Sequence, residues 1–342
     1  MGIKLNDFSI KIFDVSEFNG IINWQKVKAS GITAIGIRIG FGANIDAKFI
    51  ANVEGAKSVG IAVFFYWYGD YYSNWFNKKH SAYGMADAAW GKQQADNCVK
   101  FAEKYGISII FLDIENVTVK GFPKLTETTA KKHAMPIYKA FLKRLDELKI
   151  NNGIYCSLGW IPWFTDNYFK EKPLWVAYYP YRWAVVTVER VLALCKYYGW
   201  IGETLMWQYA SDGDVDDNGT EDGISQGMQY KFLDLNGWVA SEELYKKYFG
   251  NIVVPNPEDT SYEDDETQGE VEKPIIYTDY IVTAWPRLMV RSYPDKTAPI
   301  LDRISYNKML PICGVVTGDG SQSKGWGKTI NGYASMNWLK KG

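Results

Sequence analysis

Over its first 250 residues this chain alternates short apolar runs with longer amphipathic stretches, and that alternation limits the folds it can adopt. The stretches at 87–104 and 129–149 space their apolar residues for one face of a helix, and Pro136 predicts a kink or a late start in the second. The apolar runs are strand candidates: Ile10–Val15, Ala34–Ile39, Ile61–Tyr66, Ile107–Leu112, Gly153–Cys156, Leu174–Ala177 and Leu205–Tyr209. Because strand–helix alternation produces parallel sheets, we expect an α/β fold with the sheet closed into a TIM-like barrel.

Two carboxylates, Asp113 and Glu115, directly follow the strand candidate Ile107–Leu112. Residues i and i+2 of a strand point to the same side, ~6.5 to 7 Å apart along it. Burying carboxylates costs free energy, so a buried strand that ends in two of them favours a chemical use. Paired carboxylates suit glycosidic bond cleavage, with one as acid and one as anion. A solvated acidic turn is the alternative that these residues leave open.

In such barrels the active site lies at the C-terminal ends of the strands. Acidic and aromatic residues occupy these positions: Asp14, Tyr66, Asp113, Glu115, Trp175 and Trp207. The chain is 16% aromatic, with 14 Trp and 24 Tyr, and aromatic faces stack on sugar rings, which favours a carbohydrate-handling surface. A larger aromatic core is the plainer explanation for most of them.

Composition argues against several other classes of protein. A net charge of −1 gives no nucleic-acid signature, and no run of 18 apolar residues predicts a membrane span. The start has no apolar segment of a signal peptide, so we expect synthesis in the cytoplasm. The 4 cysteines are far apart in sequence and predict free, buried thiols.

A change in charge near residue 250 predicts the domain organisation. Residues 251–273 carry 8 acidic residues against 1 Lys and have little apolar content, which is typical of a solvated linker. Residues 274–342 carry 9 Lys and Arg against 4 Asp, a net charge of +5. We therefore expect a large domain at 1–250, an acidic linker, and a small basic module at 274–342.

The motifs of the large domain resemble, in family order, those of glycoside hydrolase family 25, the lysozymes found in many phage endolysins. Phe13–Gly20, followed by Asn23-Trp24, is similar to the family's DxS…NG…W opening, and Phe111–Glu115 to its DxE motif. The later strands are matched by Gly153–Cys156, Leu174–Tyr179, Met206–Tyr209 and Phe232–Asn236. An aromatic insertion at 69–84 and an expansion between Pro180 and Gly227 depart from the family pattern.

The resemblance implies a barrel of eight strands and five helices that cleaves the β-1,4 bond between N-acetylmuramic acid and N-acetylglucosamine. It implies Glu115 as general acid/base, Asp113 as its partner carboxylate, and Asp14 and Asp234 as further acids of the cleft. Four aromatic residues are candidates for substrate binding: Tyr66, Trp207, Tyr179 and Trp175. We expect such an enzyme to act on peptidoglycan after a holin has released it from the host cytoplasm.

The chemistry of the pair agrees with these roles. A neighbouring carboxylate and an apolar strand end both raise a carboxyl pKa, so we expect Glu115 to hold the proton and Asp113 to stay ionised. Spacing between carboxyls of ~5 to 5.5 Å indicates retention and ~6.5 to 9.5 Å inversion, and this pair falls near the boundary. The N-acetyl group of the substrate offers a third route as nucleophile, and we favour that route, with retention.

Other wall-directed functions fit less well. A zinc amidase needs His-rich ligation, yet the chain has only 2 His, His80 and His133. A cysteine peptidase needs a Cys activated by a nearby His, and no such pairing is indicated. The main alternative is a non-hydrolytic wall-binding protein on a lysozyme scaffold, which the intact set of four acids argues against.

An acidic stretch, Asp212–Gly223, resembles a calcium loop in part. Asp214, Asp216, Asn218 and Gly219 match its positions one, three, five and six, but position twelve is Ser225 where Glu is expected. We expect a flexible acidic turn here and no metal or other cofactor in the reaction, and a calcium site at Asp214–Asp222 is the alternative.

The small module resembles bacterial SH3-type wall-binding domains. Its motifs are Leu288–Ser292, Gly325–Lys328 and Gly332–Leu339, short alternating runs broken by turns. The resemblance implies a small β-barrel that binds peptidoglycan, and the +5 charge suits an anionic wall. Aromatic candidates for wall binding are Trp285, Tyr293 and Trp326. A stabilising domain without a ligand is the alternative.

Overall fold

The computed structural model divides the chain into two compact units, Met1–Pro255 and Asn256–Gly342. The structure describes residues 3–71, 81–82, 84–116, 125–180, 186–250, 278–284, 287–291, 295–297, 300–317, 320–329 and 332–341. The expected linker at 251–273 and the residues His80, Trp285 and Tyr293 lie outside them. No helix among the described residues is long and apolar enough to span a membrane.

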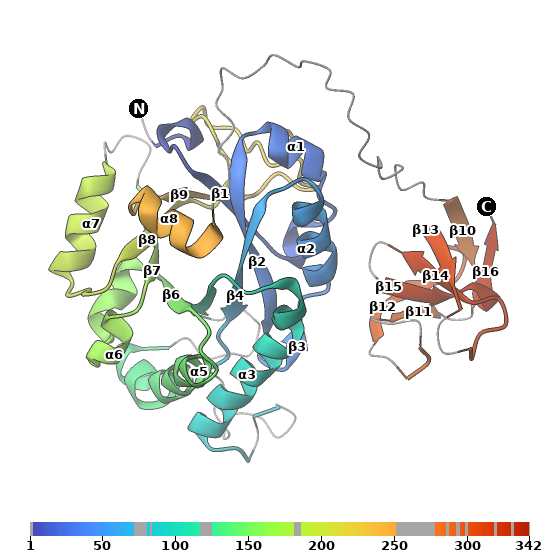
Figure 1. Ribbon diagram of the computed structural model, residues 1–342, viewed down its shortest axis with the longest axis horizontal. Helices are drawn as coiled ribbons and strands as arrows, with labels where there is room; N and C mark the ends of the chain where they lie inside the picture. The colour runs from blue at the N-terminus through green and yellow to red at the C-terminus, as the bar shows by residue number, and fades with distance from the viewer. Residues whose placement is uncertain are drawn as a thin grey trace. The chain divides into compact units, whose positions relative to one another are not determined.

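The first unit is a closed barrel of eight strands (Figure 1). Its strands are β1 (Lys11–Val15), β2 (Ile32–Phe41), β4 (Ala62–Tyr68), β5 (Ile110–Ile114), β6 (Asn152–Ser157), β7 (Leu174–Ala177), β8 (Thr204–Ala210) and β9 (Asp234–Trp238). Pairing of β1 with both β2 and β9 closes the barrel, and the short β3 (Asn44–Ile45) forms a hairpin with β2. The predicted β/α barrel is confirmed.

Helices connect the strands around the outside. They are α1 (Trp24–Ala29), α2 (Phe49–Ser58), α3 (Asp87–Ala102), α5 (Met135–Glu147), α6 (Asn167–Lys170) and α7 (Val188–Tyr197). The predicted start of the helix at 129 is explained by α4 (Glu127–Thr129) and a π-helical segment, Ala130–Ala134, which lead into α5. Pro136 stands in the first turn of α5, directly after the π-helical segment, so the helix changes its hydrogen-bond pattern where the proline lacks an N–H.

One strand departs from the predicted parallel sheet. β9 runs antiparallel to both of its neighbours, β1 and β8, whereas the other seven barrel strands are parallel. Asp234, the first residue of β9, therefore lies at the same end of the barrel as the C-terminal ends of the other strands. Asp14 and Asp234 are partners in the β1–β9 register.

Alternating side chains build two cores on the two faces of the strands. In β5, Ile110, Leu112 and Ile114 pack outward against the helices, whereas Phe111 joins the barrel interior. The interior also holds Phe64 and Trp175. Helix α8 (Glu242–Phe249) closes the opposite mouth of the barrel, with the Phe249 ring 6.0 Å from that of Phe64 (Figure 1).

Apolar packing accounts for the cysteines of the first unit. Cys98, Cys156 and Cys195 are free and buried, as predicted. Burial raises the pKa of the Cys98 and Cys156 thiols, so they behave as small core residues and not as nucleophiles.

The second unit contains one antiparallel sheet of seven strands in the order β12-β11-β15-β14-β13-β10-β16. The strands are β10 (Thr278–Val282), β11 (Arg287–Arg291), β12 (Ile300–Ser305), β13 (Met309–Val316), β14 (Trp326–Thr329), β15 (Gly332–Ser335) and β16 (Leu339–Lys341). Its apolar core includes Val282, Val290 and Ala334, none of which is exposed.

Candidate active site

Four carboxyl groups gather at the end of the barrel opposite α8. Asp14 and Asp113 stand on the inner face of β1 and β5, where the strands bury them, and Glu115 follows the end of β5. Asp234 joins them because β9 is reversed. The charge of Asp14 acts on the other three carboxyls, which shows that the four predicted acids share one site.

Asp14 is fixed by two amide donors. Asn236 Nδ2 donates to Asp14 Oδ2 at 2.8 Å, and Gln208 Nε2 donates to the same oxygen at 3.0 Å. The indole N–H of Trp175 in turn donates to Asn236 Oδ1 at 2.8 Å. A carboxylate held by two such bonds has one orientation.

Gln208 is itself oriented by two tyrosines. The hydroxyl of Tyr155 donates to Gln208 Oε1 at 2.7 Å, and the hydroxyl of Tyr179 donates to the same oxygen. Tyr179 is 49% exposed, and its role in substrate binding stays a prediction. Sequence reasoning missed Gln208, Asn236 and Tyr155, although Gln208 and Asn236 stand at inward positions of the motifs Met206–Tyr209 and Phe232–Asn236.

Two of the predicted substrate-binding aromatics are buried, and the structure does not place them in an open cleft. Trp175 is 1% exposed and packs edge-on against Tyr155 inside the barrel, where it positions Asn236. Trp207 is 0% exposed, packs on the outer face of β8 and donates to the carbonyl of Tyr178 at 2.7 Å. The physical reason is strand alternation, since Trp207 precedes the inward Gln208 and so points outward.

Tyr66 lies inside the barrel beneath the acids. Its hydroxyl is 3.4 Å from the carbonyl oxygen of Val15, and the charges of Asp14, Asp113 and Asp234 act on it. Burial and these charges raise its pKa well above the usual value, so it stays a neutral hydrogen-bond donor. Tyr66 is 8% exposed, and its role in substrate binding stays a prediction.

Burial raises the pKa of all four carboxyls. The pKa of Glu115 rises to about 7 through burial, with an opposing hydrogen bond from Tyr68 and a further rise from the charge of Asp14. That of Asp14 rises to about 6, because burial outweighs the bonds from Asn236 and Gln208. Burial also raises the pKa of Asp234 well above its ordinary value.

The surroundings of Asp113 do not favour the ionised state expected from the sequence. Burial raises its pKa well above the usual value, and the charges of Glu115 and Asp14 add to the effect. Its Oδ1 is buried without a hydrogen-bond partner among the described residues. The four carboxyls therefore disfavour one another's ionisation, and one oxygen of Asp113 has no hydrogen bond within the described part of the chain.

The cation that acts on this cluster is Arg38. It reaches Asp46 and Glu17 at 2.8 Å each, and its charge lowers the pKa of Asp113. Its guanidinium also lies 4.8 Å from the centre of the Phe18 ring. Phe18 is exposed, and beside it a hollow of about 610 Å³ extends to Asp234 with Ile224, Tyr230 and Phe232 in its walls. Sequence reasoning did not single out these residues.

The raised pKa of Glu115 predicts a pH-dependent stability. Its folded-state pKa of about 7 exceeds the ordinary 4.5, so the folded state gains stability below pH 4.5 and loses it as pH rises to 7. Glu115→Gln removes that loss, so it should gain up to about 3 kcal/mol over wild type at pH 8. Thermal melting at pH 4.5 and pH 8 measures this, and a difference in Tm that is the same at both would contradict it.

The second unit has a cationic hollow of about 290 Å³. Arg287, Met289 and Arg291 project from one side of β11, since Leu288 and Val290 between them are buried. Lys296 and the exposed Trp338 complete its rim. Trp326, a predicted wall-binding residue, lines it but is 2% exposed.

Paired carboxyl groups at the C-terminal rim of a β/α barrel suit the hydrolysis of a glycosidic bond. Residues 13–218 match the sequence model of glycosyl hydrolases family 25. This match spans more than half of the chain, which therefore belongs to family 25 and is a glycoside hydrolase.

Solved structures share the fold at low identity. A family 25 glycosyl hydrolase from Bacillus anthracis is 16% identical with a TM-score of 0.50, over 72% of this chain and 96% of that one. The modular autolysin LytC from Streptococcus pneumoniae, solved with a synthetic peptidoglycan ligand, is 18% identical with a TM-score of 0.50. That match covers 67% of this chain and 46% of LytC. Among curated proteins, none matches.

Proposed function

We propose that this enzyme is an N-acetylmuramidase of the endolysin type, which cleaves the β-1,4 bond between N-acetylmuramic acid and N-acetylglucosamine. The observation that carries the proposal is the group of four carboxyls at one end of the barrel, where burial raises the pKa of Glu115 to about 7. A general acid with a pKa of about 7 donates its proton to a leaving sugar oxygen at neutral pH.

Asp113 supports a route in which the substrate assists. In this route the N-acetyl oxygen attacks the anomeric carbon, the glycosidic C–O bond breaks, and Glu115 protonates the leaving oxygen. The unpartnered Oδ1 of Asp113 is suited to accept a hydrogen bond from the N–H of the substrate's N-acetyl group. It also stabilises the positive charge of the ring that closes when the N-acetyl oxygen bonds to the anomeric carbon. Glu115 then removes a proton from the water that opens the ring, so the β configuration is retained.

The exposed rings beside Asp234 extend the proposed substrate cleft. Phe18, Tyr230 and Phe232 offer faces on which sugar rings stack, and the Arg38 guanidinium packs over the ring of Phe18. Tyr179, which bonds to Gln208, presents another ring at the other side of the acids.

Analysis of digested walls tests the reaction class. Mass spectrometry should show fragments with new reducing ends at N-acetylmuramic acid, and NMR of fresh product should show the β-anomer first. Reducing ends at N-acetylglucosamine or free amino groups would contradict a muramidase, and early α-anomer would contradict retention.

We further propose that the second unit anchors the enzyme to the wall through its cationic hollow. The positive charges of Arg287, Arg291 and Lys296 suit an anionic group of peptidoglycan. Trp338 offers an aromatic ring beside them. A tethered enzyme has a high local concentration at its substrate. A cationic anchor of this kind would serve the expected SH3-like role, and the predicted contributions of Trp285 and Tyr293 stay predictions because both lie outside the described residues.

Removal of the two arginines should release the enzyme from walls. In the full chain, Arg287→Gln with Arg291→Gln should weaken co-sedimentation with purified walls by roughly tenfold to a hundredfold, because charge-assisted hydrogen bonds are lost. Lys340→Gln with Lys341→Gln is the matched control, since it removes the same charge from exposed positions outside the hollow. Equal loss in both variants would show that net charge alone binds walls.

A further inference from the structure

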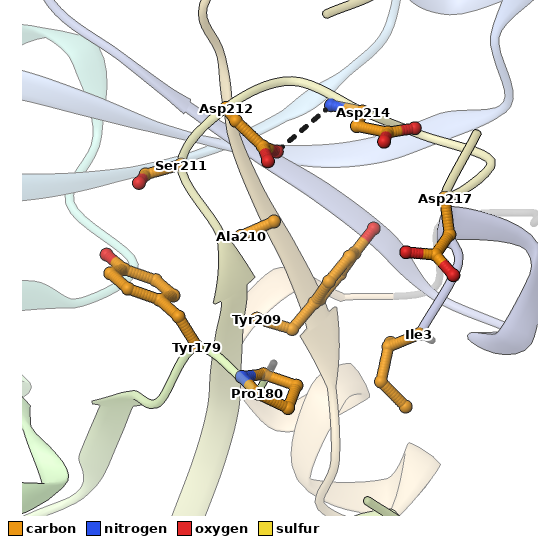
Figure 2. A pocket seen from close by; sticks show the side chains of 9 residues that line it. All are labelled: Ile3, Tyr179, Pro180, Tyr209, Ala210, Ser211, Asp212, Asp214 and Asp217. Atoms are coloured by element: carbon orange, nitrogen blue, oxygen red, sulfur yellow. Dashed lines mark hydrogen bonds between the residues drawn. The ribbon is translucent and has the colours of Figure 1, made fainter. Parts of the chain in front are cut away.

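A small cavity beside the cleft has an acidic wall (Figure 2). It has a volume of about 140 Å³ and lies between the end of β8 and the loop that leads to β9. Asp212, Asp214 and Asp217 form the acidic side, and Tyr209 faces them. Tyr179 lines the same cavity, so this loop adjoins the proposed substrate cleft.

The hydroxyl of Tyr209 points into these acidic surroundings. Tyr209 is 3% exposed, and its hydroxyl has no hydrogen-bond partner among the described residues. Figure 2 shows its oxygen on the side of Asp217 and Asp214. Buried hydroxyls in folded proteins take partners, so this orientation points to a polar ligand between the ring and the loop.

The loop beyond the cavity brings three carboxylates together. One side-chain oxygen from each of Asp214, Asp216 and Asp222 lies within 4.8 Å of the other two. Calcium binds oxygen at 2.3 to 2.6 Å, so ligands on opposite sides of one ion are about 4.6 to 5.2 Å apart. The separations of the three oxygens are therefore compatible with a single shared calcium ion. Their places are one, three and nine of the calcium-loop spacing, and Asp222 supplies an acid that Ser225 at position twelve does not.

We propose that the acidic loop binds one calcium ion, with Asp214, Asp216 and Asp222 as direct ligands and Tyr209 hydrogen-bonded to a water of that ion. Asp214 connects the two parts of the site, since it belongs to the carboxylate group and also lines the Tyr209 cavity. Calcium fits better than magnesium, because magnesium demands near-ideal octahedral geometry and keeps several waters.

The role of the ion is to hold the loop in place. Six acidic residues repel one another between 212 and 222, while Lys231 pairs with Glu221 at 3.3 Å. The loop connects the strand that carries Gln208 to the strand that begins at Asp234. An ion that neutralises the loop therefore holds the ends of both strands in position. This role does not depend on the reaction that Glu115 carries out.

Calorimetric titration of the metal-free full chain with calcium tests the site. Wild type should bind one equivalent, and calcium at a hundredfold excess over Kd should raise Tm by roughly 5 to 10 °C. Asp216→Asn with Asp222→Asn should weaken binding more than tenfold. Glu221→Gln is the matched control, because it removes a charge from the same loop but no ligand, and it should bind within about threefold of wild type.

Terbium provides a second measurement that needs no ligand variant. Terbium bound in the loop should show luminescence sensitised by nearby aromatic rings, and calcium should displace it. No calcium binding by wild type at millimolar concentration would overturn the proposal. Undiminished binding by the Asp216/Asp222 variant would also overturn it. Tyr209→Phe should weaken binding several-fold, and unchanged affinity would remove Tyr209 from the site.

Discussion

Glu115→Gln should lower the rate of hydrolysis of soluble wall fragments by ~10² to 10⁴-fold. Glutamine keeps the shape and polarity of the side chain but has no proton to give to the leaving oxygen. The measurement is the rate of release of reducing ends near pH 6, where wild-type Glu115 is largely protonated.

Two comparisons make this result specific to Glu115. Glu203→Gln, an exposed acid near the start of β8, should leave the rate unchanged. The wild-type rate itself should fall as pH rises through about 7, because Glu115 then loses its proton. Near-normal hydrolysis by a folded Glu115→Gln protein would remove Glu115 from the role of acid.

Asp113→Asn should be almost as severe, with a loss of roughly 10² to 10³-fold in kcat and a smaller change in KM. The asparagine can still contact the N-acetyl group, but it provides no negative charge when positive charge develops on the sugar. The measurement is steady-state hydrolysis of a soluble muropeptide substrate. Because Asp113 is buried, circular dichroism and Tm must first show that the variant is folded.

A covalent trap separates two routes for the same residue. If the N-acetyl group is the nucleophile, mechanism-based inhibitors should leave no glycosyl adduct on Asp113. Recovery of such an adduct by peptide mass spectrometry would instead make Asp113 the nucleophile and contradict the substrate-assisted route.

Much of the barrel could be predicted from the sequence because its strands are buried on both faces. Runs such as Leu174–Ala177 are continuously apolar and stand out, and that strand has the predicted bounds. The reversal of β9 could not be read from periodicity, since a buried strand has the same pattern in either direction. Its direction is shown by its antiparallel register with both β1 and β8.

The four acids could be named from the sequence, but most of the residues that orient them through hydrogen bonds could not. Asp14, Asp113, Glu115 and Asp234 belong to motifs with an expected order, but Gln208, Asn236 and Tyr155 matter through contacts between strands distant in sequence. Trp175 and Trp207 show the opposite error. Both are aromatic residues near strand ends, and only the side to which each points decides whether it meets substrate or core.

The reversal of β9 also affects how this enzyme can vary. In a wholly parallel barrel each connection returns to the far face and carries a helix that packs on the sheet. Here β8 and β9 form a broad hairpin whose loop, residues 211–233, starts and ends at the catalytic rim. Insertions there need no repacking of a helix, so the loop can lengthen while the barrel stays unchanged. Tyr230 and Phe232 beside Asp234 and the acidic turn near Tyr209 all belong to that loop, which makes it the natural place to exchange when a new glycan specificity is designed.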